Sequence, residues 1–324
     1  MKLQILIPQY QETDEIIKPL LDSIALQQNV DMNEIGAIIA NDGSDVFLSE
    51  SFLQSYPFKI EYYKNSHQGV SATRNYCLDK AIAEYVMFCD ADDMFYNMCG
   101  LYIIFRDMEF SPFDGILSVF TEETRDSTTG YPVYINREMD STFVHGKVYR
   151  RQYLIDNNIR FNPNLTIHED SYFNCLAQKC ATELRFCPTP FYLWRWRDES
   201  VCRHDPKYSL NTYNNMIESN DALVEEFIRR ERIQDAQYYV TFMVYDAYFT
   251  MNKDEWINQE NKQYRNMTEL RFKEYYRKYK KYFDEIDHTI KAQIIMNIKN
   301  RFYTEGLLME SVTFDDWIKH IDKL

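Results

Sequence analysis

The sequence predicts an α/β domain built on a mostly parallel central sheet flanked by helices, followed by an all-helical C-terminal region. Short apolar runs alternate with helical stretches in the first half of the chain, which is typical of βαβ units. The apolar run 85–89 stops directly at Asp90, Asp92 and Asp93, as a strand does at the ligand-binding edge of an open sheet. After about Asp205 glycine and proline almost disappear and the periodicity becomes helical.

The first predicted elements are a strand, a helix and a second strand. Leu3 to Ile7 is a compact apolar strand, which we expect to end at Pro8 because proline cannot donate a hydrogen bond to a central ladder. Thr13 is the expected N-cap of a helix whose apolar residues recur at helical spacing up to Ile24. Ile35 to Ala40 predicts the second strand, which runs into the tight turn 41–45.

The alternation continues with a third strand from Phe58 to Tyr63 and a helix from Val70 to Glu84. This order predicts parallel strands joined by right-handed crossovers. The remaining predicted elements are a strand at 114–120, a loop at 121–130, an edge strand within 131–144, a short helix at 153–157, a helix at 169–181 and an aromatic strand at 191–197.

Composition bounds the class of protein. With 324 residues, 45% of them hydrophobic, the chain is expected to hold one large domain, 1–205, and a smaller helical domain, 206–324. We find no apolar run long enough to span a bilayer and no signal segment, which predicts a cytoplasmic protein, with peripheral membrane association left open. Seven cysteines without a C-x-x-C pair indicate reduced thiols.

The net charge of -14 disfavours broad binding to nucleic acid or anionic lipid. The exception is the segment from Arg271 to Phe283, in which lysines and arginines alternate with tyrosines. It can meet a polyanionic acceptor, DNA or a membrane surface, or it can be a solvated helix face with tyrosines packed beneath.

Carboxylates gather at the predicted strand ends. Asp90 and Asp92 are hard oxygen ligands that suit Mg²⁺ or Mn²⁺ bound to nucleotide phosphates. Asp42 ends the second strand and should point into the same crevice, while Arg74 lies near a helix N-terminus that favours phosphate. Each feature alone has a plainer interpretation, namely an acidic turn, an Asx-turn and a solvated helix face.

Taken together, the motifs resemble the family 2 glycosyltransferases over residues 1 to about 205. The resemblance lies in the order and spacing of five segments: Ile5-Leu6-Ile7-Pro8-Gln9-Tyr10, Asn41-Asp42-Gly43-Ser44-Asp45, Gly69-Val70-Ser71-Ala72-Thr73-Arg74-Asn75, Phe88-Cys89-Asp90-Ala91-Asp92-Asp93 and His168-Glu169-Asp170. The sequence departs from the family where Gln11 replaces the usual Asn and Thr73 a common Ala.

The resemblance implies the GT-A fold, which is Rossmann-like, a nucleotide-diphospho-sugar donor with UDP as the commonest nucleotide, a divalent metal and inversion at the anomeric carbon. It implies that Pro8, Tyr10 and Glu12 line the nucleoside pocket and that Asp42 binds the base or ribose. Arg74 would help to hold the base edge near Asp42. Asp90 and Asp92 would form the family's DxD motif, with Asp92 the more direct metal ligand.

The pair Glu169-Asp170 matches the family's acidic pair, in which the second acid is usually the general base. A sugar hydroxyl is a poor nucleophile, so a carboxylate within hydrogen-bond reach must take its proton. The resemblance extends to 194–197, where Arg197 or Arg195 would pair with the diphosphate and Trp194 or Trp196 would stack on the acceptor sugar. His204 is a further candidate ligand for the metal or a phosphate.

Other functions are less compatible with the residues. A nucleotidyltransferase should carry a basic glycine-rich loop after the first strand, and here that place is Pro8-Gln9-Tyr10-Gln11-Glu12. A non-catalytic sugar-nucleotide-binding module would not need Asp42, Asp92 and Asp170 together. For the acceptor we expect a surface glycan or a teichoic-acid-like polymer, with modified DNA bases and protein side chains as alternatives.

Overall fold

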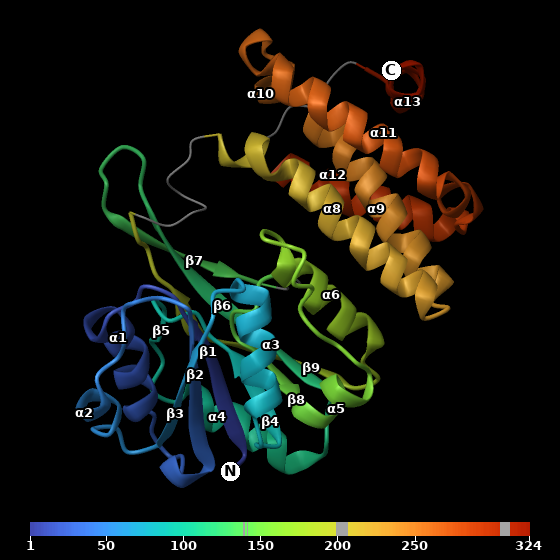
Figure 1. The fold of residues 1–324 in the computed structure, drawn as a ribbon. Helices are drawn as coiled ribbons and strands as arrows, with labels where there is room; N and C mark the ends of the chain where they lie inside the picture. Colours follow the sequence, from blue (N-terminus) through green and yellow to red (C-terminus); the bar gives the residue numbers. More distant parts are fainter. Residues whose placement is uncertain (139, 141, 199–206, 305–311) are drawn as a thin grey trace. The chain divides into compact units, whose positions relative to one another are not determined.

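The structure is a computed structural model that describes residues 1–138, 140, 142–198, 207–304 and 312–324 (Figure 1). The chain divides into two compact units, Met1–Ser200 and Val201–Leu324. The described part of the first unit contains a nine-stranded sheet in the order β3-β2-β1-β4-β8-β6-β9-β5, with β7 beside β6. The strands are β1 Leu3–Gln9, β2 Ile35–Asp42, β3 Lys59–Asn65, β4 Tyr85–Phe88, β5 Met94–Phe95, β6 Gly115–Arg125, β7 Pro132–Arg137, β8 Lys147–Arg150 and β9 Leu184–Trp194.

The sheet is mixed rather than mostly parallel, because parallel and antiparallel pairings are equally frequent among its described strands. Strands β3, β2, β1 and β4 pair in parallel, and β6 pairs in parallel with β9. Strand β8 lies antiparallel between β4 and β6, and the edge strands β5 and β7 are also antiparallel to their neighbours. The helices of this unit are α1 Asp14–Ala25, α2 Glu50–Leu53, α3 Val70–Lys80, α4 Gly100–Phe110, α5 Arg151–Asp156 and α6 Glu169–Cys180, with a 3-10 turn η1 Met32–Glu34.

Both faces of the sheet are covered by apolar packing. One core cluster joins Ile5 and Ile7 of β1 to Ile17 of α1 and Leu101 of α4. On β4 the alternate residue Phe88 packs edge-to-face against Phe161 and against Phe173 of α6, with ring centroids 5.0 and 5.4 Å apart. A strand buried on both faces reads as a continuous apolar run, which explains why β1 and β4 were recognisable from sequence.

Pro8 corrects one expectation, because β1 continues through it to Gln9 with Pro8 paired to Ala40 of β2. The carbonyl of Leu6 accepts a hydrogen bond from the Cys89 N–H, so the even-numbered residues of β1 direct their backbone polar groups towards β4. Pairing with β4 stops at Phe88, opposite Leu6. Pro8 therefore faces a side without a ladder partner, and its missing N–H costs no hydrogen bond.

Other boundaries also differ from the sequence expectation. Helix α3 ends at Lys80, four residues before the expected end, and β6 runs on to Arg125 through the first half of the expected loop. Residues 121–125 gain β partners because β7 pairs with them as a hairpin. Strand β9 begins at Leu184, and its register against β6 shifts at Ser118 and Phe120, opposite a segment that contains Pro188 and Pro190.

The second unit is helical, as expected. Its helices are α8 Tyr208–Arg229, α9 Ile233–Met251, α10 Asp254–Ile257, α11 Lys262–Glu285, α12 His288–Thr304 and α13 Phe314–Lys323, with a 3-10 turn η2 Gln259–Asn261. In the basic segment of α11, Tyr275 and Tyr279 are buried and Lys278 forms ion pairs with Asp221 and Glu225 of α8. The segment is thus a helix face with tyrosines packed beneath it.

Among the described helices, none combines the length and apolar character that crossing a bilayer requires. The six cysteines within the described residues are all free thiols.

Candidate active site

Three neighbouring strands end at one edge of the sheet. The parallel strands β2, β1 and β4 lie side by side, so Asp42, Gln9 and the acids after Phe88 follow adjacent carboxyl ends. The start of α3 reaches the same edge, because the Asp42 carboxylate accepts hydrogen bonds from the backbone N–H groups of Gln68 (2.8 Å) and Gly69 (2.9 Å). Gly69 provides the positive φ of 89° that this turn into α3 requires.

The guanidinium of Arg74 joins segments that are far apart in sequence. It donates hydrogen bonds to three carboxylates: Asp90 after β4 (2.9 Å), and Glu169 (2.9 Å) and Asp170 (2.7 Å) in the first turn of α6. The side chain is only 4% exposed, and it also lies over the ring of Phe161 at 5.2 Å. One buried cation faces three acids, so the cluster carries surplus negative charge when all three are ionised.

The environment separates the acids by protonation behaviour. Burial raises the pKa of Asp170 to about 8, and the charges of Glu169 and Asp90 add to this rise while Arg74 opposes it. Burial acts the same way on Asp90, but Arg74 and His145 outweigh it and lower the pKa of Asp90. The two carboxylates share one arginine but differ in protonation: Asp90 stays ionised, whereas Asp170 exchanges a proton near neutral pH.

The position of Arg74 corrects one expected contact. Arg74 was expected to help hold the edge of the nucleotide base near Asp42. Its guanidinium instead pairs with Asp90, Glu169 and Asp170. The residue that does contact Asp42 is His67, whose Nδ1 lies 2.9 Å from Asp42 Oδ2. His67 is absent from the expected set because nothing in a single histidine before Gly69 signals this contact.

Asp92 lies at the more open side of the edge. Its side chain is 32% exposed and forms an ion pair with Arg197 (2.8 Å), whose guanidinium is also 4.0 Å from Glu12. The Arg195 guanidinium donates to the backbone carbonyl of Asp92 (3.1 Å). Burial and the charge of Asp90 raise the pKa of Asp92. The ends of β1, β4 and β9 therefore meet around this carboxylate.

Asp93, which was expected to meet Asp90 and Asp92 in one crevice, is buried, and its carboxylate lies within 4.8 Å of that of Asp90. Asp93 accepts hydrogen bonds from the Tyr192 hydroxyl (2.5 Å) and the Arg195 N–H (2.9 Å). It therefore ties the end of β9 to the loop after β4. His145 lies beneath it, with Nδ1 3.8 Å from Asp93 Oδ2, between the rings of Phe143 and Tyr192.

The nucleoside side of the expected site has one exposed aromatic wall. The Tyr10 ring is exposed and lies 4.9 Å from the His67 ring, tilted by 33°. The Tyr10 N–H donates to the Glu12 carboxylate (2.8 Å). Tyr10 after β1, Asp42 at the end of β2 and His67 before α3 therefore form one connected group. Pro8, the second-last residue of β1, is close to Tyr10 in the sequence.

The two tryptophans have different surroundings. Trp194 ends β9 and packs against Phe143 and His145, with ring centroids 5.1 and 5.4 Å away. Trp196 lies against the β6–β7 hairpin, where its backbone N–H donates to the Glu123 carboxylate (3.2 Å) and Arg125 lies over its ring at 5.4 Å. His204 lies outside the described residues.

The residues fit a divalent cation. Ligand atoms of Asp90, Asp93 and His145 all lie within 4.8 Å of one another, and the buried His145 Nδ1 has no hydrogen-bond partner among the residues that the structure describes. Burial lowers the pKa of His145 to about 4, so the imidazole is neutral and can donate its lone pair. Asp92 adds an accessible carboxylate whose pKa is raised by burial and by the charge of Asp90, although Arg197 opposes the rise.

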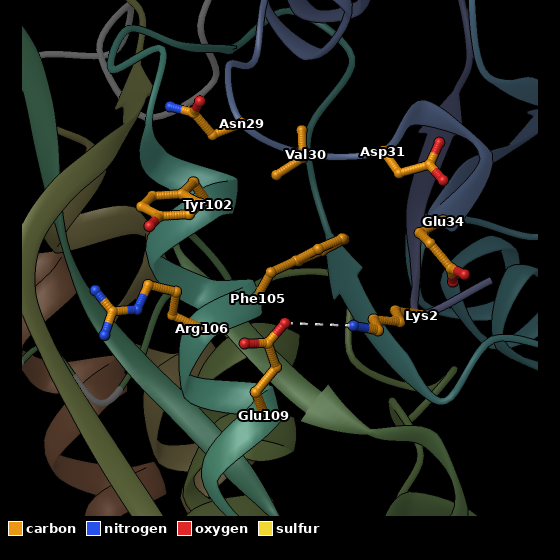
Figure 2. A pocket seen from close by; sticks show the side chains of 9 residues that line it. All are labelled: Lys2, Asn29, Val30, Asp31, Glu34, Tyr102, Phe105, Arg106 and Glu109. Atoms are coloured by element: carbon orange, nitrogen blue, oxygen red, sulfur yellow. Dashed lines mark ion pairs between the residues drawn. The ribbon is translucent and has the colours of Figure 1, made fainter.

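The cavity drawn in Figure 2 is a different place in the molecule. It has a volume of about 290 Å³ and lies at the amino ends of the strands, since Lys2 precedes β1 and Glu34 precedes β2. Its lining mixes charges, and Lys2 pairs with Glu109 at 3.8 Å. The remaining lining residues are Asn29, Val30, Asp31, Tyr102, Phe105 and Arg106. Parallel sheets bind ligands at the carboxyl edge, so the Arg74 cluster is the stronger candidate.

Comparison with known proteins gives a family match. The model of the family described as Glycosyl transferase family 2 matches residues 4–175, which includes every acid of the Arg74 cluster. A Bacillus subtilis (strain 168) protein named EpsH is 24% identical over 241 residues, covering 66% of this chain and 67% of EpsH. Poly(ribitol-phosphate) beta-N-acetylglucosaminyltransferase TarS of Staphylococcus aureus (strain Mu50 / ATCC 700699) is 24% identical over 213 residues, 61% of this chain but only 36% of TarS.

The solved structures agree on the fold. The crystal structure of residues 1–349 of S. aureus TarS superposes with a TM-score of 0.63 at 18% identity, covering 94% of this chain and 92% of that one. The same TarS fragment has been solved in complex with UDP-GlcNAc, with a TM-score of 0.59 at 19% identity. The expected GT-A fold with a helical C-terminal region is thereby confirmed.

Proposed function

Because the chain belongs to glycosyl transferase family 2, we propose that it moves a sugar from a nucleotide-diphospho-sugar to an acceptor hydroxyl, with inversion at the anomeric carbon. The observation that carries this proposal is the meeting of Asp90, Asp170 and Arg74 at the carboxyl edge of the sheet. These residues come from the loop after β4, from α6 and from α3, so their approach is a property of the fold and not of local sequence.

Asp170 is the proposed general base. Arg74 holds Oδ1 at 2.7 Å and the Val144 N–H holds Oδ2 at 3.3 Å, so the carboxylate is oriented at both oxygens. A base is most effective when its pKa lies near the working pH, and burial brings the pKa of Asp170 to about 8. Glu169 shares Arg74 and adds negative charge beside Asp170, which raises that pKa further.

Asp92 and Asp90 are the proposed holders of Mg²⁺ or Mn²⁺. A bound cation would stabilise the charge that develops on the leaving diphosphate. Arg197 lies 2.8 Å from Asp92 and is placed to contact the same phosphate groups. Tyr10 and Asp42 are the proposed contacts of the nucleoside, with Glu12 and Pro8 beside them, and Trp194 or Trp196 those of the acceptor sugar.

We propose UDP as the nucleotide because the similar TarS structure has been solved with UDP and with UDP-GlcNAc. A teichoic-acid-like polymer or a surface glycan is the proposed acceptor class. TarS is named for poly(ribitol-phosphate), and a further relative, 23% identical over 219 residues, is the minor teichoic acid biosynthesis protein GgaB of Bacillus subtilis (strain 168).

The direct test is release of UDP from a panel of UDP-sugars in the presence of Mn²⁺. We expect slow hydrolysis of one UDP-sugar in water and faster release of UDP from the same donor when a polyol-phosphate or glycan acceptor is added. An inactive binding module would bind the donor without releasing UDP. Failure to bind any UDP-, GDP- or dTDP-sugar would refute the proposal.

Removal of the metal provides a second test. Chelation with EDTA is expected to abolish turnover, with recovery on adding Mn²⁺ or Mg²⁺, and Asp92→Asn should lower kcat by about 100-fold or more because a bound cation supplies several kcal/mol of charge stabilisation. Titration calorimetry of Mn²⁺ with UDP should show weaker binding to the Asp92→Asn protein. Full activity in EDTA would show that the acids act without a metal.

The rate should also depend on pH in one direction. Asp170 accepts a proton only when ionised, and its raised pKa leaves it mostly protonated below about 8. We therefore expect kcat to increase with pH and to level off above about pH 8. At each pH the fraction of folded protein is measured as well, so that unfolding is not mistaken for loss of activity. A profile that stays flat between about pH 6 and about pH 9 would remove Asp170 from the role of base.

A further inference from the structure

Lys147 is a buried cation that the proposed roles do not use. It is the first residue of β8, and its side chain is only 1% exposed. Burial lowers its pKa to about 8, while the charges of Asp140 and Asp170 act in the opposite direction. Burying an ammonium group costs several kcal/mol unless its partners compensate. A lysine held in such a place therefore needs a structural explanation.

The contacts of Lys147 lie in the loop that leads into β8. Its ammonium group donates to the backbone carbonyl of Phe143 and lies 3.9 Å from Asp140 Oδ1. That Asp140 oxygen also accepts hydrogen bonds from the N–H groups of Thr142 (2.8 Å) and Phe143 (2.9 Å). Asp140 and residues 142–147 thus form a turn closed by one carboxylate and one ammonium group.

The same turn is docked on α6 at two points. The Val144 N–H donates to Asp170 Oδ2 (3.3 Å), and the buried Asn174 amide donates to the Thr142 carbonyl (2.7 Å). Asp170 and Asn174 are four residues apart on one helix, so they present a single face to the loop. The N–H that orients the second oxygen of Asp170 therefore belongs to the turn that Lys147 closes.

We infer that Lys147 is a positioning residue for transfer, which closes the turn formed by Asp140 and residues 142–147 so that the Val144 N–H holds Asp170 in the orientation required of a base. Lys147 itself touches no reacting atom; it acts through Val144. The inference rests on the proposed function for its effect on rate, but the loop geometry can be measured without any substrate.

The variant Lys147→Met removes the charge and retains the length of the side chain. Hydrogen exchange of the peptide covering 142–147 is expected to be at least about 10-fold faster in Lys147→Met than in wild type, since the amide of Val144 loses its fixed place. Lys147→Arg keeps a cation and should restore part of the protection. Unchanged exchange in Lys147→Met would overturn the inference, whether or not the protein is a transferase.

The kinetic arm tests the link to Asp170. Lys147→Met should lower kcat by about 10-fold to 100-fold with the donor KM unchanged, as expected for a misplaced catalytic group. The same change made in Asp170→Asn should have no further effect, because both act through one carboxylate. Equal losses in both backgrounds would assign Lys147 to general stability and overturn the inference.

Asp140→Asn is the companion variant if Lys147→Met does not fold. Asparagine keeps an oxygen for the Thr142 and Phe143 N–H groups and removes only the charge that faces Lys147. Asp140→Asn should speed hydrogen exchange in 142–147 and lower kcat, as Lys147→Met does. If neither hydrogen exchange nor kcat changes, the inference is overturned. A wild-type protein that lacks all transferase activity refutes the proposed function, while the hydrogen-exchange measurement still tests the inference about Lys147.

Discussion

Asp170→Asn is expected to lower kcat for sugar transfer on the order of 1000-fold, because general base catalysis contributes roughly that much and asparagine cannot take the proton. The variant should remain folded. The amide oxygen of asparagine can still accept the hydrogen bond from Arg74, the longer bond from the Val144 N–H is lost, and burial already disfavours the charge that the change removes. The measurement is single-turnover transfer from a UDP-sugar, together with UDP affinity by calorimetry, which should stay near the wild-type value.

Glu169→Gln is the matched control for this prediction. Glu169 shares Arg74 with Asp170, lies next to it in α6 and carries the same functional group. We expect a loss of about 10-fold or less, since Glu169 affects only the charge around the base. If Glu169→Gln is the more damaging variant, the two acids have the opposite roles, and the assignment of Asp170 is wrong.

Arg74→Met is expected to destabilise the protein by about 3–5 kcal/mol at pH 8, the usual effect of removing one partner of a buried ion pair. The change leaves Asp90, Glu169 and Asp170 close together without their shared cation. Denaturant unfolding followed by fluorescence measures the loss. The outcome that contradicts the prediction is a loss below about 1 kcal/mol, as an exposed pair would give.

The loss in Arg74→Met should also shrink as the pH falls. In wild type Arg74 lowers the pKa of Asp90 and opposes the rise at Asp170, so without it both folded-state pKa values increase. The folded variant then binds protons more tightly than wild type, and its stability relative to wild type improves towards low pH. Arg137→Met is the control, because Arg137 lies on the exposed strand β7 and pairs with Glu122 of β6, so its loss should have little effect at either pH.

Several parts of the fold could be predicted because they depend on short-range patterns. The strands β1 and β4 are continuous apolar runs, and α1 shows apolar residues at helical spacing, so each was recognisable within its own segment. The end of β6 was not, because residues 121–125 become a strand only through pairing with β7. Pro8 likewise fits into β1 only because β4 stops pairing before it.

The candidate site divides in the same way. The sequence alone predicted that the acids after the strands lie close together, because the carboxyl ends of parallel strands share one edge of the sheet. The spacing of its motifs also predicted the glycosyltransferase family. Only the tertiary structure decided that Arg74 faces Asp90, Glu169 and Asp170, that Asp93 turns inward, and that Lys147 is buried behind the base. The reason is physical: periodicity shows which side of an element is apolar, whereas packing between distant segments determines the partner of a buried charge. Arg74 and Asp170, for example, are 96 residues apart in the sequence.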